Sequence, residues 1–185
     1  MKKRLFISIP LPKDITDAFS ALQDRTRYRQ LRWVDPSQFH VTVCFLGDVE
    51  EELLVLISEA LSAVVAKAKP FDLQLQKIGL FPPKIVRPTM VWGFFQESEL
   101  FEDLVRQTKE SLMKSDTSFM RLAEEWRKDI PHVTLARFRG NDYPRTFDPV
   151  PATTLRVDRI EIMESVLYPD GPMYSSLASF LFQSK

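Results

Sequence analysis

Two hydrophobic periods alternate along the first half of the chain. A β-prone run over 4–9 is stopped by prolines, and apolar residues then recur at helical spacing over 15–22. A β-rich run over 39–47 is followed by apolar positions at helical spacing over 53–64. A third alternating run, over 71–78, leads into the proline-rich stretch FPPKIVRP. This half is therefore predicted to alternate strands with helices.

The same order begins again in the second half. Residues 89–95 are β-prone, 100–112 have a helical period, and PHVTLARF predicts a strand over 132–138. Two further strands, over 155–163 and 174–182, are predicted around a Pro- and Gly-rich turn. Short strands with segregated helices indicate an α+β fold. The repeated strand, helix and strand predict two similar lobes within a single domain over 1–185.

Charge and cysteine content narrow the function classes. The 25 basic and 25 acidic side chains cancel, so a long nucleic acid is not held by the bulk field, and we expect RNA contacts that are local and only weakly salt-dependent. Arg25, Arg27, Arg29 and Arg32 are interpreted as a solvated helix face. The N-terminal apolar run is too short for a signal peptide. A lone cysteine, Cys44, fits a reducing compartment, so we expect a cytoplasmic protein.

Both histidines of the chain stand in the tripeptide His-Val-Thr, at 40–42 and 132–134. With ten threonines in 185 residues, two histidines both followed by Thr at the second position has a chance of about 0.3%. In a strand, residues i and i+2 share a face. His40 and Thr42 are thus predicted on one face, with the core on the other side, formed by Val41, Val43 and Phe45.

Strict alternation makes the same prediction for the second motif. It places His132, Thr134 and Ala136 together and turns Val133 and Leu135 inward. Two imidazoles and two hydroxyls facing one another suit displacement at phosphorus, where one proton leaves the nucleophile and another reaches the leaving oxygen. Histidine titrates near neutrality, and threonine hydroxyls can donate to non-bridging oxygens.

Three other interpretations compete for these residues. Either histidine alone is most simply a structural residue, but the repeat argues against that for both. Zinc binding is disfavoured because neither motif has a second histidine at helical spacing or a nearby cysteine pair. Nucleophilic catalysis by Cys44 needs a thiolate; alternation puts Cys44 on the His40 side, yet its apolar strand favours inert packing.

The chain resembles the two-histidine phosphoesterases, specifically the bacterial and archaeal RNA 2′,3′-cyclic phosphodiesterases also named 2′-5′ RNA ligases. The resemblance rests on RLFISIPLP, RWVDPSQFHVTVCFLGDV, FPPKIVRPTMVW, PHVTLARF and IMESVLYPDGPMYSSLASF, which together span nearly the whole chain. It implies a bilobal fold of two pseudo-symmetric antiparallel sheets with outer helices, intertwined lobes and a central cleft. The segment SFMRLAEEWRKDI departs from the family pattern.

The resemblance also implies roles. His40 is expected to be the proton donor and His132 the proton acceptor in opening a cyclic phosphate to a 2′-phosphate, without a metal or cofactor. Thr42, Thr134 and Arg137 are expected to bind the substrate phosphate. Strict alternation, however, puts Arg137 on the face opposite His132, so a bulge or strand end must redirect it.

Several alternatives stay open at this point. The same residues suit a 2′-5′ RNA ligase, a phosphodiesterase of small cyclic nucleotides, or a non-catalytic module that binds RNA ends. The expected partners are RNA ends with a cyclic phosphate or small cyclic nucleotides. We expect a monomer that needs neither a membrane nor a protein partner.

Overall fold

A computed structural model describes residues 1–26, 31–82, 88–124, 129–138, 144, 146–169 and 171–183. Its strands are β1 (Lys2–Pro10), β2 (Leu31–Trp33), β3 (His40–Glu50), β4 (Phe71–Phe81), β5 (Met90–Phe95), β6 (His132–Phe138), β7 (Thr154–Val157), β8 (Arg159–Tyr168) and β9 (Gly171–Leu181). Its helices are α1 (Lys13–Arg25), α2 (Leu54–Val65) and α3 (Glu99–Ser115), with 3-10 turns η1 (Pro36–Gln38), η2 (Glu51–Leu53) and η3 (Thr117–Glu124).

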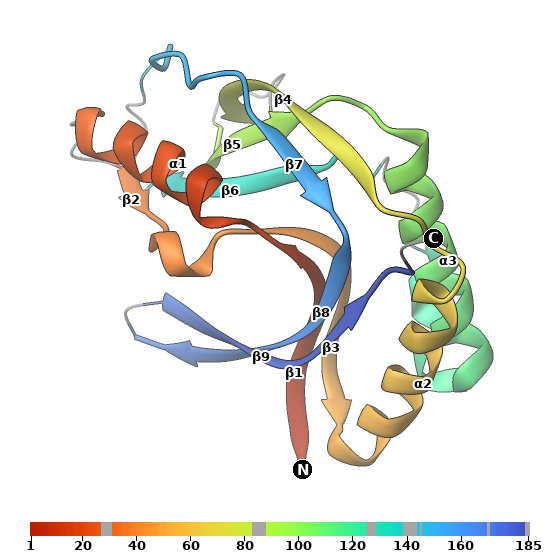
Figure 1. Cartoon of the computed structure of the whole chain (residues 1–185). Coiled ribbons are helices and arrows are strands. Elements are labelled where there is room, and N and C mark those ends of the chain that lie inside the picture. Colours follow the sequence, from red (N-terminus) through yellow and green to blue (C-terminus); the bar gives the residue numbers. More distant parts are fainter. Residues whose placement is uncertain are drawn as a thin grey trace.

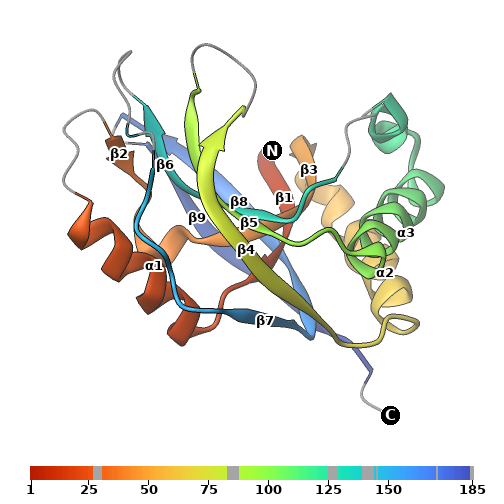
Figure 2. The ribbon, with the colours of Figure 1, turned by 90° about the horizontal axis from the view of Figure 1, so that it is seen from above.

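The strands form one curled sheet, with α1 on one side of the molecule and α2 and α3 together on the other (Figures 1 and 2). Among the described residues the strand order is β7-β4-β5-β6-β3-β1-β8-β9, and β2 pairs with β6. Every pairing is antiparallel. The predicted α+β class with antiparallel strand pairing and outer helices is therefore confirmed, and the two predicted sheets are halves of one continuous sheet.

Two halves of the sheet meet at a single residue pair. β9-β8-β1-β3 lie on one side and β6-β5-β4-β7 on the other, and Val41 of β3 pairs with Val133 of β6. The helices cross between the halves. α1 follows β1, but its Phe19 ring lies 3.1 Å from the position that a Cβ on Gly93 of β5 would take. α3 follows β5 but contacts β3. The apolar faces of the helices thus join the halves into one core.

Three predictions about elements are wrong in detail. The predicted strand over 155–163 is two strands, because the apolar alternation changes phase after Val157: β7 pairs with β4, whereas β8 pairs with β1 and β9. α1 ends at Arg25, and Arg32 lies in the short strand β2, so it is not on a helix face. β2 itself is absent from the prediction, since three residues are too few to show a period. Arg27 and Arg29 lie outside the described residues, as do 83–87 of the proline-rich stretch.

No helix in the described ranges is both long and apolar enough to cross a membrane.

Candidate active site

The pairing of Val41 with Val133 brings the two His-Val-Thr motifs together. Both valines are fully buried in the core. Residues directly opposite each other in an antiparallel pair share a face, and successive residues along a strand alternate. With Val41 opposite Val133, the register sets Thr134 opposite His40 and Thr42 opposite His132, on the side of the sheet away from the two valines. Two imidazoles and two hydroxyls therefore lie on one face, around an approximate twofold axis between the motifs.

Each imidazole is held in the same way. His40 Nδ1–H donates to the Gln38 carbonyl at 2.8 Å, and His132 Nδ1–H donates to the Ile130 carbonyl at 2.7 Å. A carbonyl only accepts, so these bonds fix the Nδ1–H tautomer and leave Nε2 as the reactive nitrogen on both rings. In this arrangement, either ring is able to accept a proton when neutral or donate one when charged.

Burial lowers the pKa of both imidazoles, because it disfavours the charged form. For His40 the pKa falls from 6.5 to about 4; the bond to the Gln38 carbonyl opposes this shift, and repulsion between the two rings when both carry a proton adds to it. Burial also lowers the pKa of His132, against the bond to the Ile130 carbonyl. A bound anion would act in the opposite direction, because a nearby negative charge stabilises an imidazolium.

Aromatic side chains fix the ring planes. The His132 ring stacks on Trp92 with centroids 3.5 Å apart, and Trp92 stacks in turn on Phe81 at 3.4 Å. His40 lies 4.8 Å from the ring of Phe6 and 5.2 Å from that of Tyr174, edge to face. These contacts restrict rotation of the imidazoles and shield them from solvent.

A bulge in β3 changes which residues face the site. Ile7 pairs with Cys44 and Ser8 with Thr42, so Val43 is an extra residue and the alternation slips by one. Strict alternation placed Cys44 on the same face as His40, but the bulge turns Cys44 into the core. Phe45, predicted in the core, is 41% exposed under the Arg4 guanidinium, 4.9 Å from its carbon. The expectation of inert packing fits the buried Cys44.

A second bulge, in β6, redirects Arg137. Val91 pairs with Ala136 and Trp92 with Thr134, so Leu135 is the extra residue. Ala136, predicted beside His132, is instead buried in the core. Arg137 pairs with Met90 and its Nη1 lies 3.6 Å from the Met90 sulfur, on the face that carries Trp92 and His132. The bulge that the Arg137 assignment required is thus present.

Gln38 is a site residue that sequence reasoning missed. Its carbonyl accepts from His40, and its side-chain Oε1 accepts from the backbone N–H of Tyr174 in β9 at 2.7 Å. Asp35 holds the turn that presents it: its carboxylate accepts from Ser37 N at 2.9 Å, and its carbonyl from Gln38 N at 2.8 Å. The D-P-S sequence signals such a turn, but nothing local indicates the long-range contact with β9.

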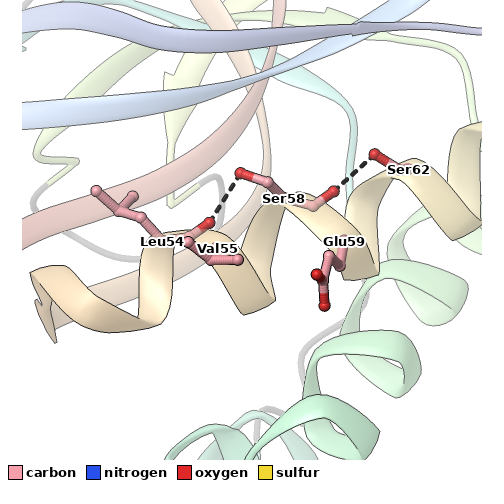
Figure 3. A pocket seen from close by; sticks show the side chains of 5 residues that line it. All are labelled: Leu54, Val55, Ser58, Glu59 and Ser62. Atoms are coloured by element: carbon pink, nitrogen blue, oxygen red, sulfur yellow. Dashed lines mark hydrogen bonds between the residues drawn. The ribbon is translucent and has the colours of Figure 1, made fainter.

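Depressions elsewhere on the surface offer less chemistry. One, on α2, is lined by Leu54, Val55, Ser58, Glu59 and Ser62 (Figure 3). Both of its serine hydroxyls are already bonded to α2 carbonyls at 2.8 Å. Another lies between 75–78 and 147–152 and contains no histidine. Within the described ranges, no three His, Cys, Asp or Glu side chains are grouped as metal ligands.

An α+β fold whose antiparallel sheet carries paired His-Val-Thr motifs at its centre is typical of the two-histidine phosphoesterases. The profile of the family described as "LigT like Phosphoesterase" matches residues 9–92. A protein of Thermus thermophilus named RNA 2′,3′-cyclic phosphodiesterase is 31% identical and covers 96% of this chain and 89% of its own length. One of the same name from Methanothermobacter thermautotrophicus is 29% identical over 97% of this chain and 99% of its own.

The fold gives the same result. The crystal structure of the Thermus thermophilus protein TT0787 superposes with a TM-score of 0.85 at 26% identity, covering 97% of both chains. The chain belongs to the LigT-like phosphoesterase family.

Proposed function

We propose that this chain is an RNA 2′,3′-cyclic phosphodiesterase that hydrolyses the cyclic phosphate to a 2′-phosphate with His40 as proton donor and His132 as proton acceptor. The observation that carries the proposal is the Val41–Val133 pair, which sets both imidazoles and both threonines on one face. The names of the full-length relatives support the substrate class.

In the proposed reaction, water attacks phosphorus and the bond to the ribose 3′ oxygen breaks. Neutral His132 accepts the water proton at Nε2, and protonated His40 donates from Nε2 to the leaving oxygen. Thr42 and Thr134 donate hydrogen bonds to the non-bridging oxygens, and Arg137 adds a charged, forked donor. The Nδ1 bonds to backbone carbonyls hold both rings in the tautomer that these steps need.

The near-twofold geometry does not distinguish donor from acceptor, so this assignment follows the family resemblance. For His40 to donate, its pKa must rise from about 4 when substrate binds. The phosphate anion supplies the required charge, because an opposite charge within about 4–6 Å favours the protonated ring.

The decisive assay offers an oligoribonucleotide ending in a 2′,3′-cyclic phosphate, with a metal chelator present, and identifies the terminal phosphate formed. We expect a 2′-phosphate, and a loss of roughly a hundredfold or more in kcat for His40→Ala or His132→Ala. Added imidazole should restore part of the activity of each folded variant. Full activity of either variant would overturn the mechanism, and binding without turnover by the wild type would favour an RNA-end binding module.

Other substrates offered under the same conditions distinguish the related activities. Cleavage or joining of a 2′-5′ linkage in preference to the cyclic phosphate would indicate a ligase, and preference for a cyclic mononucleotide would indicate a small-nucleotide phosphodiesterase. We further propose that the protein acts as a monomer in the cytoplasm. Its single cysteine, Cys44, is buried in the core, which is consistent with a reducing compartment.

A further inference from the structure

Two arginines stand directly opposite each other on β2 and β6. Arg32 pairs with Arg137, so both side chains leave the sheet on the face that carries the histidines. Among the described residues neither arginine forms an ion pair with a carboxylate. Like charges in this position destabilise a strand pair, so the pair is suited to an anion from outside the protein.

The hairpin of β8 and β9 lies close to the Arg32 guanidinium at Gly171. Arg32 Nη2 lies 2.7 Å from the position a Cβ on Gly171 would take, and Gly171 has φ +128°. Any other residue there would be strained and would displace the guanidinium. The Tyr174 phenol, three residues further along β9, is also near charge: burial raises its pKa, while the Arg137 and Arg4 guanidiniums oppose the shift.

The arginine pair lies further along the sheet than the His-Val-Thr motif of β6. Arg137 is three residues after Thr134 on β6, which at about 3.3 Å per strand residue is about 10 Å less the shortening at the bulge. Arg137 can turn back toward the phosphate held by the four motif side chains. Arg32 lies opposite Arg137 on the neighbouring strand β2, about 5 Å further across the sheet.

An exposed aromatic residue lies opposite Gly171 in the same hairpin, so it shares the face to which a side chain at Gly171 would point. Tyr168 pairs with Gly171 across the β8–β9 turn and is 53% exposed. Single-stranded nucleic acids are bound by cations that follow the backbone and by aromatic rings on which bases stack. A guanidinium and an exposed phenol ring at one turn match that combination.

We propose that Arg32, with Tyr168 beside it, binds the nucleotide that precedes the reacting end, its guanidinium contacting the upstream phosphodiester, so that an RNA chain is preferred over a cyclic mononucleotide. This inference rests on the proposed phosphodiesterase function and specifies its substrate class. It assigns to Arg32 a specificity role separate from the proton transfers.

The test compares kcat/KM for a short oligoribonucleotide with a 2′,3′-cyclic phosphate end and for the corresponding cyclic mononucleotide. The wild type should prefer the oligonucleotide, and Arg32→Ala should reduce this preference about tenfold, the effect of one lost charge-assisted hydrogen bond. The slope of log affinity for the oligonucleotide against log salt should become shallower by about 0.7. Arg156→Ala is the matched control, because Arg156 is an exposed arginine on β7 paired with Asp72.

A modified substrate tests the proposal without altering the fold. An oligonucleotide with an uncharged methylphosphonate at the upstream linkage should lose the same factor with the wild type, and Arg32→Ala should then have no additional effect. Equal wild-type efficiency on chain and mononucleotide, or equal losses on both in Arg32→Ala, would overturn the subsite and leave the phosphodiesterase function intact. No turnover of any cyclic phosphate by the wild type would instead refute the proposed function.

Discussion

The proton on His40 provides the most demanding test of the site. With a pKa of about 4 in the free protein, the ring should be neutral at pH 7. An anion bound between the two motifs should draw a proton onto it. The perturbation is therefore the addition of sulfate, a phosphate analogue whose own charge stays constant between pH 4 and 8.

The size of the pKa shift on sulfate binding follows from the charge of the anion and its distance from the ring. A pKa of about 4 leaves about 0.1% of His40 protonated at pH 7. An opposite charge within about 4–6 Å raises a pKa by about 1–3 units, which lifts the protonated fraction to between about 1% and about 50%. By linkage, sulfate should bind about 10- to 1000-fold more tightly to the protonated form, so its affinity should increase as the pH falls from 7 toward 4.

Nuclear magnetic resonance of the imidazole rings measures this directly, since the chain contains two histidines and His132→Gln assigns the signals. The His40 ring should titrate near pH 4 without sulfate and one to three units higher with it. The same shift should separate the alkaline limb of kcat, which reports the enzyme–substrate complex, from that of kcat/KM, which reports the free enzyme. A His40 ring that titrates near 6.5 in the free protein, or that sulfate leaves unchanged, would refute the reasoning.

Two further predictions concern the support of His40. Gln38→Leu removes the acceptor for the Tyr174 N–H, so we expect a loss of about 1 kcal/mol in the free energy of unfolding and a lower kcat. Gln76→Leu, at an exposed position on β4, is the control. Unchanged melting and kcat in Gln38→Leu would contradict the prediction. The lowered pKa of His40 means that the unfolded chain binds a proton near pH 6.5 and the folded protein only near 4. The free energy of unfolding should therefore fall by up to about 3 kcal/mol as the pH drops from 6.5 to 4, because of the His40 ring alone. His40→Gln should remove this part of the pH dependence of stability, measured by denaturant titrations at each pH. The same pH dependence in wild type and His40→Gln would contradict the lowered pKa of His40.

The sequence predicted the elements and the motifs well, because both depend on local patterns. Helical spacing of Ile15, Phe19 and Leu22 placed α1, and the repeated His-Val-Thr placed both central strands. It also placed Val41 and Val133 in the core, where the structure has them.

One group of failures concerns the phase of the strand alternation. Nothing in HVTVCFLG or HVTLARF marks Val43 or Leu135 as an extra residue, since a bulge is decided by the partner strand and by twist. Strict alternation was therefore wrong at Cys44 and Phe45 in β3 and at Ala136 in β6. The face of Arg137 was likewise not predictable from its own segment.

Arg32 and Gln38 illustrate a second limit: Arg32 lies close to Gly171 of β9, and Gln38 accepts a hydrogen bond from Tyr174 of β9. A basic residue near a predicted helix is usually solvated, and a glutamine before a strand carries no signal. Their significance arises only when β8 and β9 pair beside β1.

The strand order has a consequence for how the protein is made. β1 emerges from the ribosome first, yet on one side it pairs with β8, more than 150 residues later in the chain. Contacts so distant in sequence slow folding, and they cannot form during most of synthesis. Until β8 arrives, that edge of β1 exposes unpaired backbone groups to other chains. A translation arrest after β6 but before residue 159 would therefore leave a polypeptide that contains both histidines but lacks Tyr174 and the strand that Gln38 anchors.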